Sequence, residues 1–271
     1  MRYCMNFQNE TRILNKVDEI NIKYNRNNTH ILEFLEAHQG QIINICLENA
    51  EAVELFINNN EVHNLSYIKS QYPILQFKVR LFTYNKNQEL FNKLKENNIP
   101  VFINTYINSW DMLTTYLQLG VSDVYIVNEM GFDLKAIKSV AGDTSIRVFP
   151  HIAQSSSEAF TDIKAFFIRP EDIDLYSAVV DVCEFIDVEK TVDTYYQIYA
   201  EKKKWFGRLN EIILGLKSDL DSRYIVPAFG RQRIKCSKKC LKGGRCATCD
   251  RVEQLSHTLA DRNLIVMRKE N

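Results

Sequence analysis

Short β-branched, apolar runs alternate with amphipathic stretches of helical length through the first two-thirds of the chain. Such runs are typical of strands, whereas apolar residues at every third or fourth position predict a helix. Strict alternation of strand and helix implies a parallel sheet with helices covering its outside. The predicted strands cover 19–24, 41–47, 76–84, 100–106, 122–127, 145–150, 164–169 and 178–186.

Helix start and stop signals lie between these strands. Asn108 and Ser109 predict an N-cap, and Gly120 and Gly142 each predict the end of a helix. The stretch 60–73 is longer than a loop needs and predicts an additional helix. The predicted crossover helices cover 28–39, 49–60, 85–98, 108–120 and 132–142.

The spacing of the strand–helix units decides between two α/β architectures. Eight units within roughly 185 residues favour a (βα)8 TIM-like barrel over a doubly wound open sheet, which is the competing fold. No G-x-G-x-x-G or G-x-x-x-x-G-K-[ST] sequence opens a helix. The usual phosphate-binding signatures of open sheets are therefore missing.

The pattern changes after residue 186. Residues 188–216 predict one or two helices, and residues 221–235, which contain Pro227 and Gly230, predict an extended linker. A cysteine cluster and a further helix follow. We therefore expect two parts, a TIM-like barrel over 1–203 and a basic, helical, cysteine-rich extension over 204–271.

Charge is distributed unevenly along a chain whose formal net charge is zero. The last 71 residues hold 17 lysines and arginines against 8 aspartates and glutamates, so the preceding part is acidic. A basic module on an acidic body predicts an anionic partner, docking of the two halves, or a solvated basic surface. No apolar run approaches the length of a membrane span and no signal peptide is evident, so we expect a cytosolic location without a membrane span.

Four cysteines fall within fourteen residues in the spacing C-x3-C-x5-C-x2-C. In a reducing cytosol, closely spaced cysteines are ligands more often than disulfides. Four thiolates can hold either Zn2+ or a 4Fe–4S cluster, and the spacing leaves both open. The expected metal ligands are Cys236, Cys240, Cys246 and Cys249.

Basic residues surround these cysteines. They would offset the negative charge of the thiolates and lower the pKa of each thiol, or contact the phosphates of a nucleic acid. The run contains few aromatic residues, so few rings are present on which nucleic-acid bases could stack. The expected contacts to an anionic partner are Arg231, Arg233, Lys235, Lys238, Lys239, Lys242 and Arg245.

Polar residues follow the predicted strands, where the chemistry of a (βα)8 barrel takes place. Residues at this edge that could transfer protons or bind substrate are candidates for catalysis, although polar loops and helix caps account for the same pattern. The candidates are Glu129, His151, Gln154, Glu171 and Glu184.

Residues 120–139, 144–156 and 166–185 resemble the collagenase-like peptidase superfamily, whose members include ubiquinone-hydroxylation accessory proteins and RNA-hydroxylation proteins. Asp123, Glu129, Gly131 and Gln154 occupy places similar to those of the family's strand–turn–helix and Gln-containing turn. The resemblance covers under a third of the chain. It implies a TIM-like barrel and, in many members, a 4Fe–4S cluster held by four cysteines.

With the resemblance included, we expect a metal- or iron–sulfur-containing barrel enzyme or accessory protein. Its substrate would be anionic, and RNA modification by hydroxylation is the expected reaction class. One alternative is a non-catalytic binding or assembly protein with a protein partner and a structural zinc Cys4 module. Another is a peptidase-like hydrolase.

Overall fold

The computed structural model describes residues 1–7, 16–27, 30–126, 134–153, 166–186, 191–216, 221–225, 228–234, 236, 249–252 and 254. The chain divides into two compact units. Unit 1 comprises Met1–Ile126, Asp143–Arg147 and Asp181–Ile186. Unit 2 comprises Val127–Gly142, Val148–Val180 and Asp187–Asn271. A division after residue 203 stays a prediction.

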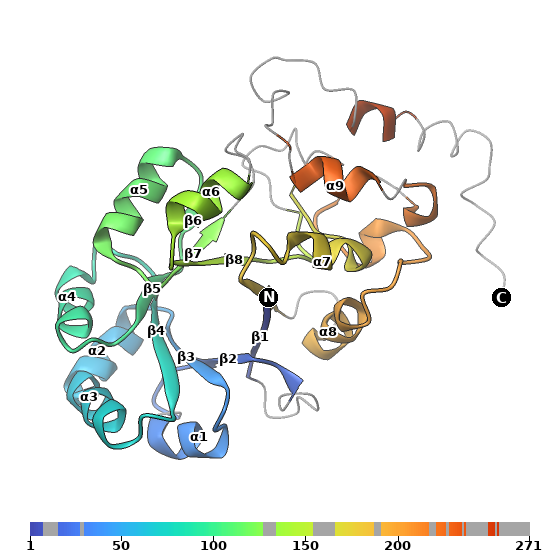
Figure 1. Cartoon of the computed structure of the whole chain (residues 1–271). Helices are drawn as coiled ribbons and strands as arrows, with labels where there is room; N and C mark the ends of the chain where they lie inside the picture. The colour runs from blue at the N-terminus through green and yellow to red at the C-terminus, as the bar shows by residue number, and fades with distance from the viewer. Residues whose placement is uncertain are drawn as a thin grey trace. The chain divides into compact units, whose positions relative to one another are not determined.

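Unit 1 is built on a parallel sheet that, over the described residues, has nine strands in the order β5-β4-β3-β2-β1-β9-β8-β7-β6 (Figure 1). The strands are β1 (Arg2–Asn6), β2 (Glu19–Lys23), β3 (Ile42–Leu47), β4 (Gln76–Leu81), β5 (Val101–Ile103), β6 (Tyr106–Ile107), β7 (Asp123–Ile126), β8 (Ser145–Val148) and β9 (Val182–Phe185).

The sheet is curled. The Ser122 N–H donates to the carbonyl of Val101 at 2.9 Å, so β7 also approaches β5 near the ends of the strand order. The predicted strand 100–106 is divided in two, because β5 pairs with β4 whereas β6 pairs with β7. The predicted α/β class is confirmed as a barrel-like parallel sheet with helices.

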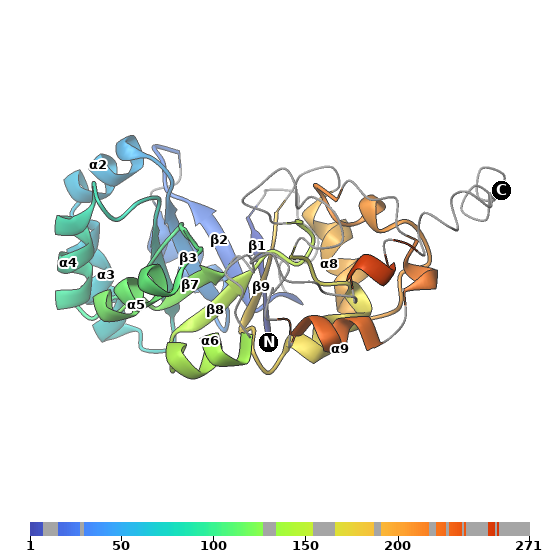
Figure 2. The same ribbon diagram turned by 90° about the horizontal axis from the view of Figure 1, so that it is seen from above.

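Helices cover the outer face of this sheet (Figure 2). The side chain of Ser109 accepts a hydrogen bond from the Met112 N–H, and Gly120 closes the same helix with a φ of 73°, as the sequence predicts. The additional helix predicted within 60–73 is also present. The helices of unit 1 are α1 (Ile31–Ala37), α2 (Ala50–Asn58), α3 (Glu61–Gln71), α4 (Gln88–Glu96) and α5 (Trp110–Leu119).

Unit 2 consists of short helices around an apolar core of its own. Its helices are α6 (Leu134–Ala141), η3 (Pro170–Asp172), α7 (Ile173–Tyr176), α8 (Val192–Ala200), η4 (Leu209–Glu211), η5 (Ser222–Tyr224) and α9 (Ala228–Ile234). A cluster within this core consists of Phe167, Leu209, Ile212, Ile213, Leu216, Ile225, Phe229, Cys249 and Val252.

Three predictions of local structure are wrong. The strand β1, which pairs with β2 and β9, was not among the predicted strands. The described part of the predicted strand 164–169 is buried but forms no strand. The predicted linker 221–235 instead contains α9, because Phe229 packs in the apolar core of unit 2 and Ile234 is buried as well.

Among the described residues, no helix combines the length and the apolar character that crossing a membrane requires.

Candidate functional site

Charged side chains fill the inner face of the sheet in unit 1, where aliphatic residues ordinarily pack. Strand side chains alternate between the two faces, so the neighbouring aliphatic residues lie on the face covered by helices. Three carboxylates and three cations gather there, all buried except for the slightly exposed tip of Arg80. These six residues, here called the ion cluster, are Glu19 of β2, Lys78 and Arg80 of β4, Asp123 of β7, Arg147 of β8 and Glu184 of β9.

Arg147 links the three carboxylates. Its Nε donates to Asp123 Oδ1 at 2.8 Å, its Nη1 lies 3.3 Å from Glu184 Oε2, and its Nη2 donates to Glu19. The guanidinium also stacks on the ring of Phe102, 4.7 Å from the ring centroid. A fully buried arginine is tolerated because every side of its fork has an acceptor or an aromatic face.

Glu184 accepts four hydrogen bonds. Its donors are Arg80 at 2.9 Å, Asn21 at 2.9 Å, the Tyr125 hydroxyl at 2.7 Å and Arg147. Burial alone would raise the pKa of Glu184, but the charges of Arg80 and Arg147 outweigh it and hold the pKa below its ordinary value. A carboxylate kept ionised in this way is suited to fixing Arg80 rather than to transferring a proton near neutral pH.

Arg80 extends this ion cluster to the C-terminal edge of the sheet. Its Nη2 donates to Asn104 Oδ1 at 2.9 Å, and its guanidinium lies over the ring of Tyr125, 5.3 Å from the centroid. Tyr106 follows at the same edge with 47% of its surface exposed. A cation, an amide and a phenol are therefore held at the edge where parallel α/β sheets bind ligands.

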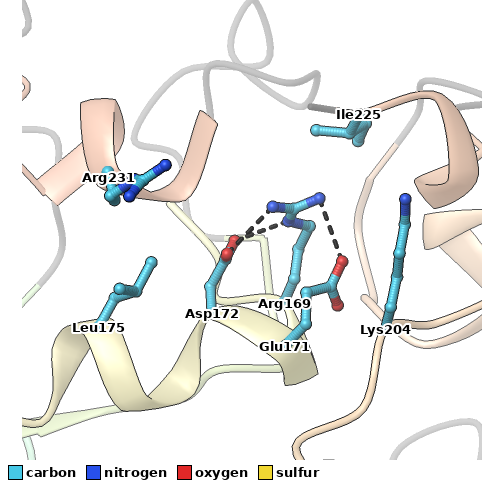
Figure 3. Close-up of a pocket in the computed structure, with 7 residues that line it drawn as sticks. All are labelled: Arg169, Glu171, Asp172, Leu175, Lys204, Ile225 and Arg231. Carbon is cyan, nitrogen blue, oxygen red and sulfur yellow. Dashed lines mark hydrogen bonds and ion pairs between the residues drawn. The ribbon is translucent and has the colours of Figure 1, made fainter. Parts of the chain in front are cut away.

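Unit 2 contains a pocket of about 370 Å3, shown in Figure 3. Arg169 lies at its base, 2% exposed. Its Nε and Nη2 donate to the two oxygens of Asp172 at 2.6 and 3.0 Å, and its Nη1 pairs with Glu171 Oε1 at 3.1 Å. The pocket is lined by Arg169, Glu171, Asp172, Leu175, Lys204, Ile225 and Arg231.

The local sequence R-P-E-D explains how Arg169 and its two carboxylate partners come together at the bottom of the pocket. A residue before proline is held in an extended conformation, and Arg169 has φ −77° and ψ 151°. Pro170 then opens the short helix η3, and its single turn brings Asp172 back to the Arg169 fork. On the other side, Gly230 of α9 approaches Asp172 so closely that an added Cβ would lie 2.4 Å from Oδ1. The carboxylate is fixed between the two segments.

The remaining cations of the pocket lack carboxylate partners in the described residues. Lys204 donates from Nζ to the backbone carbonyl of Arg223 at 3.1 Å. Arg231 is exposed, and within the described part of the chain it makes no hydrogen bond or ion pair. Figure 3 shows these two side chains on opposite sides of Arg169. The lining therefore has three cations, Arg169, Lys204 and Arg231, against two carboxylates, so it presents a net positive charge to a ligand.

Two of the four predicted metal ligands are described, and both belong to unit 2. The Cys236 N–H donates to the carbonyl of Arg233 at 3.0 Å, directly after α9. Cys249 is 8% exposed and joins the apolar core. Cys240 and Cys246 lie outside the described residues, and within those residues no cluster of three or more His, Cys, Asp or Glu could hold a metal ion.

The structure distributes the predicted catalytic residues over both units. Glu184 lies in unit 1, while Glu171 lines the pocket of unit 2. His151 is fully buried in unit 2, its ring 4.3 Å from that of Tyr195, so it lies in the interior rather than at an open edge. Glu129 and Gln154 lie outside the described residues.

The predicted anion contacts differ in their surroundings. Arg231 lines the pocket, whereas Arg233 is buried against the ring of Phe167, 4.2 Å from its centroid, and therefore serves packing. The others lie outside the described residues, namely Lys235, Lys238, Lys239, Lys242 and Arg245.

Of the ion cluster only Glu184 was a predicted catalytic residue, and Lys204 was not among the predicted site residues. The signal for the cluster was present as polar residues two positions apart within strands: Glu19 with Asn21, Lys78 with Arg80, and Asp123 with Tyr125. That spacing places both members on one face of a strand.

No protein-family model matches the sequence, no curated protein matches it, and no solved structure matches its fold.

Proposed function

We propose that this chain is a metal-containing protein with a (βα)8 TIM-like barrel that acts on an anionic, phosphate-bearing substrate. RNA is the proposed substrate and hydroxylation the proposed reaction class, as an enzyme or as its accessory protein in the cytosol. The proposal rests on the pocket of unit 2, whose cations Lys204 and Arg231 have no carboxylate partner in the described residues.

The position of Arg231 supports the link between substrate and metal. Arg231 belongs to α9, and the same helix leads directly to Cys236, the first of the four cysteines. A substrate phosphate on Arg231 would therefore lie on the segment that enters the cysteine module. When bound there, a 4Fe–4S cluster would supply electron transfer, whereas zinc would stabilise the module.

The pocket's own residues would bind and orient the substrate. Arg169 is held at three points and cannot turn toward a ligand without breaking its bonds to Asp172 and Glu171. Lys204 and Arg231 would contact phosphate oxygens, and Leu175 and Ile225 offer an apolar wall. This combination fits a phosphate attached to an apolar or aromatic group.

Two measurements on the full chain test the proposal. The first is iron, acid-labile sulfide and zinc content after anaerobic purification, with the visible absorption spectrum. Iron and sulfide in equal amounts support the cluster, whereas a colourless protein with one equivalent of zinc favours the non-catalytic binding module.

The second measurement is calorimetric binding of inorganic pyrophosphate. Arg231→Gln is expected to weaken binding about tenfold or more, because a charge-assisted hydrogen bond is lost. Lys93→Gln, on the outer helix α4, is the matched control and should bind like the unaltered chain. Equal binding by all three proteins would refute the anionic site.

A further inference from the structure

A groove of about 430 Å3 lies along α8 and the segment that follows it in unit 2. Lys204 lines this groove and also the pocket around Arg169, so one lysine is common to both. The two cavities therefore share one cation. The groove is lined by Thr194, Gln197, Ile198, Glu201, Lys203, Lys204, Trp205 and Phe206.

The groove displays an aromatic ring. Phe206 has 62% of its surface exposed, an unusual setting for a large apolar side chain. The backbone beneath it is held firmly, because the Trp205 indole donates to the carbonyl of Arg208 at 3.1 Å and packs against the apolar core. At Gly207, an added Cβ would lie 2.8 Å from the Trp205 indole nitrogen. The segment is therefore fixed while Phe206 faces solvent.

The lysines beside the ring differ in their partners. Lys202 pairs with Asp174 at 2.6 Å, and Lys203 pairs with Glu201 at 3.4 Å. Lys204 contacts only a backbone carbonyl among the described groups, so no carboxylate in them offsets its charge. The groove thus combines the largely exposed side chain of Phe206 with Lys204, a cation that also lines the pocket of Arg231.

We propose that Phe206, Lys204 and Arg231 form one binding track for single-stranded RNA. A base stacks on the Phe206 ring, and backbone phosphates contact Lys204 and Arg231. Stacking requires an unpaired base whose face is not covered by its neighbours, so the track selects single strands over duplexes. This inference rests on the proposed function and supplies the aromatic contact that the basic cysteine segment lacks.

Fluorescence anisotropy of a labelled oligouridine with the full chain tests the track. Phe206→Ala is expected to weaken binding by about tenfold, within the range measured for loss of one stacked base. Phe206→Tyr keeps a ring and should restore binding. Tyr67→Ala, which removes another exposed aromatic ring from α3, is the matched control and should have no effect.

Replacing the cations should act differently from replacing the ring. Lys204→Gln and Arg231→Gln are each expected to reduce the salt dependence of binding by about one counterion. These two variants should bind an abasic oligonucleotide as much more weakly as they bind oligouridine. Phe206→Ala should leave binding of the abasic oligonucleotide unchanged. Circular dichroism confirms that each variant is folded.

The outcomes separate this inference from the proposed function. If Phe206→Ala binds oligouridine like the unaltered chain while Lys204→Gln and Arg231→Gln bind less, the track is wrong and the anionic site stands. If neither Lys204→Gln nor Arg231→Gln changes binding, the track and the anionic site are both wrong. Equal affinity for duplex RNA, single-stranded DNA or polyglutamate overturns the assignment to single-stranded RNA.

Discussion

The ion cluster inside the sheet predicts a large loss of stability when Arg147 is replaced by methionine. Methionine fills much of the same volume, so the change mainly removes the charge and its hydrogen bonds. Arg147 is fully buried and contacts Glu19, Asp123 and Glu184. Without it, each of these buried carboxylates loses a cation.

The size of the expected stability loss follows from the ion pairs that remain without Arg147. Lys78 still binds Asp123 at 2.9 Å, Arg80 still binds Glu184 at 2.9 Å, and Arg2 still pairs with Glu19 at 2.7 Å. Since no carboxylate is left without a cation, the expected loss is that of the hydrogen bonds from Arg147 to the three carboxylates, at about 1.5 kcal/mol each for charged groups and about 3–5 kcal/mol together. That is a large part of the total stability of a typical protein, about 5–15 kcal/mol.

Urea denaturation followed by circular dichroism measures this loss. With a slope of about 3 kcal/mol per molar urea, the midpoint should fall by about 1 to 2 M. Adding Glu19→Gln to Arg147→Met should recover part of the loss, because it removes one of the buried charges. As a control, Lys93→Met breaks an exposed pair on α4 and should leave the midpoint unchanged. A loss below about 1 kcal/mol for Arg147→Met would show that the cluster is not enclosed as described.

Three further predictions concern pH, packing and capping. The charges of Arg147 and Lys78 outweigh burial and lower the pKa of Asp123, as those of Arg80 and Arg147 do for Glu184. The stability that these ion pairs contribute is therefore present above the ordinary carboxyl pKa values of 3.8 and 4.5, and it declines as the pH falls below them. Urea midpoints measured from pH 7 to pH 3 should fall, and the decline should shrink in a Glu184→Gln variant. Gly230→Ala should force Asp172 from its place and cost about 1–3 kcal/mol, with weaker pyrophosphate binding measured by calorimetry. Ser109→Ala should cost about 1 kcal/mol in urea denaturation through loss of the α5 cap, and Ser109→Asp should retain the stability.

Elements with local signals could be predicted from the sequence. The Ser109 cap and Gly120 define α5 through contacts within a few residues. By contrast, α9 depends on the burial of Phe229 in a core contributed by distant segments, which no local pattern reveals. The strand β1 is equally dependent on its neighbours, since β2 and β9 enclose it from both sides.

The candidate site shows the same division. The R-P-E-D turn that fixes Arg169 is local, because Pro170 opens η3 and Asp172 lies only three residues from Arg169. The role of Glu184 was not predictable, because its donor Asn21 lies 163 residues away and Arg80 lies 104 residues away. A glutamate on a strand is ordinarily solvated, and only the assembled sheet turns it into an enclosed counter-ion.

The enclosed ion cluster also bears on how unit 1 folds. Glu19 and Arg147 are separated by 128 positions, and Lys78 and Asp123 by 45, so no single hairpin or βαβ segment contains a complete set of partners. A partly assembled sheet would desolvate some of these charges without their counter-ions, which is unfavourable by several kcal/mol per ion. Intermediates with a few docked strands should therefore be poorly populated, and the strands of unit 1 should assemble in one cooperative step.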